Sequence, residues 1–80
     1  MNPPDRLAEH IPRRLFVRHI AAALDVPPRH ARYVLANLID ARQAGHARHR
    51  WCSPDDLIAY AVTVGESIDW LGVIDVDLGA

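Results

Sequence analysis

The stretch that decides the fold is residues 17–35, which read VRHIAAALDVPPRHARYVL. Apolar side chains recur at helical spacing over residues 20–24, and the three alanines among them favour a helix. Asp25 follows, and aspartate is one of the few residue types besides glycine that tolerate the left-handed backbone of a helix end. The prolines at 27–28 prevent the first helix from continuing, but Pro28 costs nothing as the first residue of a second helix. The stretch therefore predicts two helices joined by a tight turn.

The second helix of this pair is predicted over about residues 28–44, because apolar side chains recur at intervals of three and four until Gly45. The residues of this stripe are Ala31, Val34, Leu35, Leu38 and Ala41.

Helices are also predicted on both sides of the pair. A short one begins within residues 2–5 and ends near Pro12. Another covers residues 54–64, because Ser53 is a favoured cap and two aspartates follow in the positively polarised first turn. Gly65 ends this helix.

Three short segments have the pattern of strands. Residues 15–17 are apolar, residues 46–51 alternate with one basic face, and residues 74–78 alternate aliphatic with acidic side chains. The predicted fold is therefore mainly α with a small β component, built from three to four helices and short strands.

Composition excludes several classes of protein. A chain of 80 residues is a single small domain with a marginal core, and 50% apolar with 24% charged residues is typical of globular chains. The longest uncharged run, residues 57–65, is too short to span a bilayer. No leader sequence is apparent, and Cys52 is the single cysteine, so we expect a cytoplasmic protein without a disulfide.

The net charge of −1 conceals a strong asymmetry. Residues 1–50 hold nine arginines and four acids, a balance of +5, whereas residues 51–80 hold six acids and no base, a balance of −6. A basic half beside an acidic segment suggests a surface for nucleic acid or another polyanion.

Residues 4–52 resemble a winged helix-turn-helix, the DNA-binding fold of many transcription regulators and repressors and of phage excisionases. Ile20 and Ala21 match the apolar and small positions of the first helix, and Leu24 and Val26 flank the turn residue. Ala31 and Val34 match the inward positions of the second helix.

The sequence departs from that pattern in three places. Asp25 stands where glycine is usual, and prolines at 27–28 replace the serine or threonine cap. The wing is normally a hairpin, but here one strand leads directly into the helix at 54–64, so either the wing is degenerate or its second strand comes from residues 73–78.

The resemblance and the charge together predict sequence-specific binding of double-stranded DNA by the helix at 28–44. If its apolar stripe faces inward, the side chains near its N-terminal half face outward, where a major-groove reader contacts bases. The predicted base contacts are Arg29, Arg32, Tyr33 and Ala36. The predicted phosphate contacts are Arg18, His46, Arg48 and Arg50.

Other chemistry is weakly supported. His46, His49 and Cys52 are spaced by three, but on a strand they do not converge and no fourth ligand has the spacing of a zinc site. No nucleophile elbow, phosphate loop or metalloprotease motif is present. We therefore expect no metal, no cofactor, no small-molecule substrate and no enzymatic activity.

The acidic segment leaves one alternative open. We expect residues 1–65 to form the DNA-binding domain and residues 66–80 to pack on that domain or on a partner, with a homodimer or an adjacent DNA-bound protein assisting. In the alternative, the domain is a protein-interaction module whose acidic segment docks a partner.

Overall fold

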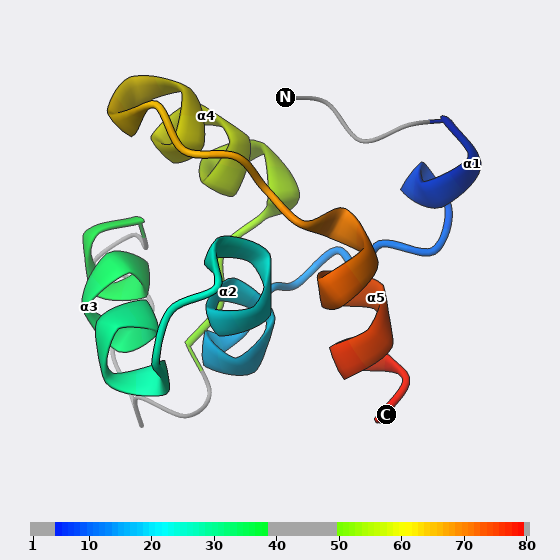
Figure 1. Ribbon diagram of the computed structural model, residues 1–80, viewed down its shortest axis with the longest axis horizontal. Helices are drawn as coiled ribbons and strands as arrows, with labels where there is room; N and C mark the ends of the chain where they lie inside the picture. Colours follow the sequence, from blue (N-terminus) through cyan, green and yellow to red (C-terminus); the bar gives the residue numbers. More distant parts are fainter. Residues whose placement is uncertain (1–4, 39–49, 80) are drawn as a thin grey trace.

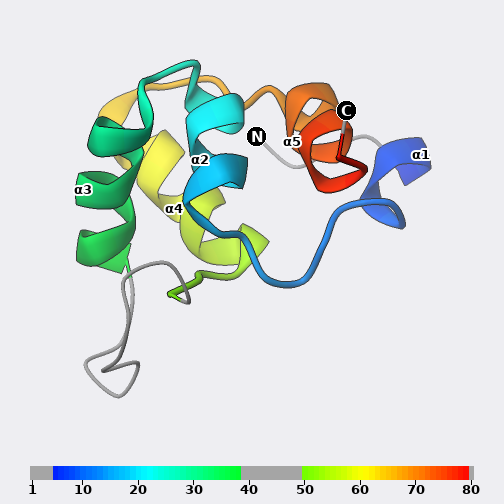
Figure 2. The ribbon, with the colours of Figure 1, turned by 90° about the horizontal axis from the view of Figure 1, so that it is seen from below.

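The computed structural model describes residues 5–38 and 50–79, and over these residues the chain is mainly helical (Figure 1). The helices are α1 (Asp5–Ala8), α2 (Val17–Leu24), α3 (Pro28–Leu38), α4 (Pro54–Val64) and α5 (Trp70–Asp77). Both ribbon views place α2 between α3 and α5 (Figures 1 and 2). The described part contains no helix of the length and hydropathy needed to cross a membrane.

The predicted helix pair is present with the predicted turn. Asp25 ends α2 in the left-handed conformation, with φ 53° and ψ 53°, and Pro28 is the first residue of α3. The buried side of α3 consists of Ala31, Val34 and Leu35, which lie at helical spacing. The predicted continuation of this helix over residues 39–44 lies outside the described residues.

The helix predicted at 54–64 is confirmed as α4, with the predicted residues at its start and its end. The Ser53 hydroxyl accepts from the Asp56 amide at 3.1 Å, and the Asp56 carboxylate accepts from the Ser53 amide at 3.3 Å. This reciprocal pair satisfies two amide donors that a helix start otherwise leaves free. Gly65, at φ 74°, ends α4.

Where the predicted strands fall on described residues, the structure contains one isolated β-bridge and no strand. Val17 already belongs to α2, so the apolar segment at 15–17 contributes one residue, Leu15, to an isolated antiparallel bridge with Cys52. The two residues exchange amide-to-carbonyl hydrogen bonds of 2.8 and 3.0 Å, and both are buried. The strand predicted at 46–51 lies largely outside the described residues.

The strand predicted at 74–78 is wrong, because these residues belong to α5 and its C-terminal cap. Residues 73–78 therefore do not supply a second wing strand either. The Asp69 side chain caps α5 by accepting from the Gly72 amide at 3.0 Å, and the Asp69 amide donates to the Ala23 carbonyl of α2 at 2.8 Å. Trp70 and Val73 then enter the core at helical spacing. Burial against α2 outweighs the local alternation that suggested a strand.

The His19 side chain connects the start of α2 to the end of α5. Its imidazole has no exposed surface, its Nδ1 accepts from the Phe16 amide at 2.9 Å, and its Nε2 lies 3.0 Å from Asp77 Oδ1. Because Nδ1 is an acceptor here, Nε2 carries the proton and donates to Asp77. One neutral imidazole thus caps the start of α2 and holds the end of α5.

The state of His19 makes stability depend on pH. Burial lowers the pKa of His19 below its usual 6.5, the neighbouring Arg18 acts in the same direction, and Asp77 opposes them. The unfolded chain therefore takes up this proton more readily than the folded one, so the free energy of unfolding falls as pH drops through about 6.5. Urea denaturation between pH 8 and pH 5.5 measures the effect.

In His19→Gln, which cannot titrate, we expect this component of the pH dependence to disappear. His30→Gln removes an exposed imidazole from α3 and serves as the control, with the wild-type profile retained. A His19→Gln protein with the full wild-type pH dependence would contradict the assignment.

Two neighbouring residues of α5 test how it packs. Trp70 is buried, whereas Leu71 is 62% exposed. Trp70→Ala removes a core side chain and is expected to lower the free energy of unfolding by about 3–5 kcal/mol. Leu71→Ala is expected to change it by about 0.5 kcal/mol or less. Equal losses in chemical denaturation would show that α5 does not pack as described.

Candidate nucleic-acid interface

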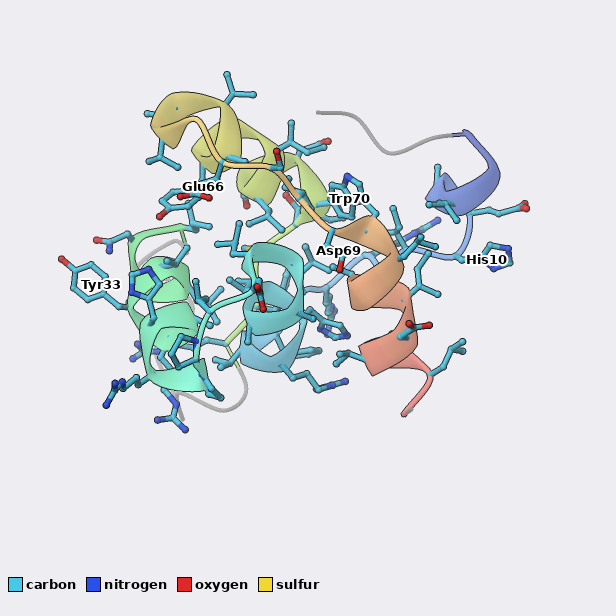
Figure 3. All side chains as sticks on the ribbon, viewed as in Figure 1. His10, Tyr33, Glu66, Asp69 and Trp70 are labelled. Atoms are coloured by element: carbon cyan, nitrogen blue, oxygen red, sulfur yellow. The ribbon has the colours of Figure 1, made fainter. Side chains whose placement is uncertain are left out.

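The outward side of α3 carries all four predicted base-contacting residues. Arg29, Arg32, Tyr33 and Ala36 are exposed, and their spacing of three and four places them on one face of the helix. Tyr33 is 70% exposed and extends away from the body of the protein (Figure 3). The residues that anchor the opposite face are buried, so the core holds α3 with this side turned to solvent.

The electrostatics of this face favour an anion. The first turn of α3 contains no acidic residue, and the histidine–carboxylate contacts of the described residues, His10 with Glu9 and His19 with Asp77, involve neither Arg29 nor Arg32. An exposed guanidinium without an ion-pair partner keeps its N–H donors for a ligand, and Arg can present two of them at once.

Sequence reasoning missed Asn37, which lies one turn beyond Tyr33 on the same side of α3. It is exposed, and its Nδ2 donates to the Tyr33 carbonyl at 2.9 Å. Its spacing of four residues from Tyr33 was the signal that could have placed it on this face.

The predicted phosphate contacts are described only in part. Arg18 is exposed in the first turn of α2, with its guanidinium carbon 5.3 Å from the centroid of the Phe16 ring. Arg50 is half-buried, and its Nε is buried without a hydrogen-bond partner in the described part of the chain. His46 and Arg48 lie outside the described residues.

A second pairing of arginine with an aromatic ring lies close by in the chain. The guanidinium carbon of Arg14 is 4.8 Å from the centroid of the Trp51 ring. Trp51 is half-buried under Arg14. No sequence signal linked Arg14 to Trp51, because the backbone bridge between Leu15 and Cys52 brings their segments together.

Cys52 is poorly suited to metal or redox chemistry. It is buried, and burial raises the pKa of its thiol to about 12, with the Asp56 carboxylate acting in the same direction. A thiol that resists deprotonation is a weak metal ligand and a weak nucleophile. Within residues 5–38 and 50–79 no group of three metal-ligating side chains is gathered. The candidate zinc ligands His46 and His49 lie outside these ranges.

An open groove separates the α1–α2 segment from the start of α4. Its walls include Glu9, Arg13 and Asp55, together with the apolar side chains of Ile11 and Ile58. Mixed charges and an open shape give this groove no dominant chemistry, and it lies apart from the side chains on the outward face of α3.

Comparison with known proteins identifies no relative of this chain: no protein-family model, no curated protein and no solved structure matches it.

Proposed function

We propose that the protein is a cytoplasmic winged helix-turn-helix factor that binds double-stranded DNA sequence-specifically, with α3 in the major groove. It acts as a small transcriptional regulator or a phage-type accessory factor such as an excisionase. The observation that carries the proposal is the outward face of α3, where Arg29 and Arg32 are exposed and form no ion pair among the described residues.

The dimensions of α3 suit this role. Its described part has 11 residues, which at about 1.5 Å each give a rod of roughly 16 Å. A major groove about 12 Å wide admits one helix, and arginine there pairs with the O6 and N7 atoms of guanine. Tyr33 is long enough to reach a base edge or a phosphate. Ala36 permits close approach of the helix backbone.

The placement of the acidic residues also supports the proposal. The α5 helix carries Asp75 and Asp77 on the far side of α2 from α3 (Figure 1). The negative charge carried by α5 is therefore kept away from the proposed DNA-reading face. Arg18, His46, Arg48 and Arg50 are the proposed phosphate contacts, and a second copy or a neighbouring DNA-bound protein would add affinity.

A second candidate function is a protein-interaction module. Leu71 and Leu78 are 62% and 77% exposed, and Asp75 lies between them on the same outward face of α5. Large exposed aliphatic side chains at this spacing are typical of a helix face that binds a protein partner.

The base-reading role of α3 is tested by Arg29→Ala and Arg32→Ala. Each substitution removes one bidentate contact and is expected to weaken specific binding by about 1–3 kcal/mol. Binding to random duplex should weaken less, so the ratio of specific to random affinity falls. The measurement is fluorescence anisotropy on duplexes selected from a randomised library with the wild-type protein.

Arg13→Ala is the matched control, since Arg13 is an exposed arginine that lines the groove beside α4 and lies off α3. Its specificity ratio should equal that of the wild type. If Arg29→Ala and Arg32→Ala also leave the ratio unchanged, α3 does not read bases.

The two candidate functions differ in their response to salt and to α5. A DNA-binding protein should bind random duplex at low salt, and its affinity should fall linearly with salt on logarithmic axes. The double variant Leu71→Ser, Leu78→Ser should bind the same duplex with unchanged affinity. Absence of duplex binding by the wild type at low salt would favour the interaction module.

A further inference from the structure

The segments before α2 and before α4 meet at the bridge between Leu15 and Cys52. The neighbours of these two residues include side chains that face solvent. Both bridge residues turn their side chains into the core. Side chains alternate along extended backbone, and Phe16 is extended at φ −94° and ψ 179°. In an antiparallel pair, the next residues opposite each other are Phe16 and Trp51. Both aromatic rings are half-buried beside the bridge, and the Phe16 ring also lies 5.9 Å from the buried His19 ring, measured between centroids.

Each ring makes a cation–π contact with one arginine. The Arg14 guanidinium lies over Trp51 at 4.8 Å and the Arg18 guanidinium over Phe16 at 5.3 Å, measured from the guanidinium carbon to the ring centroid. Both distances are within the roughly 6 Å over which a cation is attracted to an aromatic face. We call Arg14, Phe16, Arg18 and Trp51 the arginine–aromatic pad.

The pad concentrates positive charge without neutralising it. Arg14 and Arg18 are both exposed, and the ion pairs of the described residues involve neither. Stacking reduces the freedom of a guanidinium while its in-plane N–H donors stay available. Two restrained guanidinium groups, four residues apart in the chain and both beside the bridge, therefore favour an anion that carries several negative charges.

We propose that the pad binds the phosphodiester backbone of duplex DNA, with Arg14 and Arg18 contacting phosphates beside the groove that α3 enters. This inference rests on the proposed function and adds Arg14, Phe16 and Trp51 to it. The backbone bridge joins the pad rigidly to the start of α2, which leads through one turn into α3. The pad thereby sets the register of α3 on the duplex, in the manner of phosphate contacts that position a protein without reading sequence.

The experiment measures the affinity for a random-sequence duplex between 50 and 300 mM NaCl, for the full chain and its variants. Arg14→Ala and Arg18→Ala should each lower the slope of log affinity against log salt by about 1 and weaken binding about fivefold near 0.15 M salt, on any sequence. Arg14→Lys should retain the slope but bind less tightly than the wild type, because it keeps the charge and loses the planar guanidinium over Trp51. Trp51→Leu should weaken binding in the same way as Arg14→Lys.

Arg13→Ala is the control for the loss of a neighbouring charge and should leave the slope unchanged. Melting temperatures establish that each variant is folded, and Arg14→Lys provides a test that leaves the backbone bridge and the charge intact. If Arg14→Ala and Arg18→Ala behave like Arg13→Ala while Arg29→Ala still weakens specific binding, the pad proposal is overturned and the proposed function stands. If the wild type binds no duplex at low salt, both are overturned.

Discussion

The backbone bridge between Leu15 and Cys52 is the constraint on which the rest of the structure depends. It joins two segments that are 37 positions apart, and both of its side chains are buried. On one side of it α2 begins at Val17, and on the other Ser53 caps α4. A buried amide or carbonyl without a partner costs roughly 1–3 kcal/mol, so the two exchanged hydrogen bonds keep both segments in place. The orientation of α2, and through the turn that of α3, follows from this contact.

The α2 helix packs against both α3 and α5. The imidazole of His19 caps its N-terminal end. The same ring donates a hydrogen bond to Asp77 at the C-terminal end of α5. The C-terminal end of α2 passes through Asp25 into α3 and accepts the Asp69 amide at the Ala23 carbonyl. A helix of eight residues is marginal in isolation. Its stability comes from packing between α3 and α5, so the outward face of α3 and the acidic helix α5 are connected through α2.

The charges of α3 and α5 are separated in space. The exposed arginines of α3 lie on one side of α2, and the aspartates of α5 lie on the other (Figure 1). An acidic segment free to fold back would compete with a polyanion for those arginines. Capping by Asp69 and burial of Trp70 and Val73 hold α5 on the far side of α2, so the arginines on the outward face of α3 stay open to solvent.

The sequence by itself determined the helix ends and helix faces, because these depend on interactions between residues close together in the chain. The left-handed end of α2 at Asp25, the start of α3 at Pro28 and both ends of α4 depend on the conformational preferences of a few neighbouring residues, and these were predicted. The inward and outward faces of α3 followed from helical periodicity. Only the tertiary structure decided the features that rest on distant contacts. Residues 70–77 form a helix because Trp70 and Val73 are buried in the core and Asp77 bonds to His19 of α2, although residues 74–78 alternate like a strand. Arg14 stacks on Trp51 because hydrogen bonds between Leu15 and Cys52 bring together two segments that no periodicity relates.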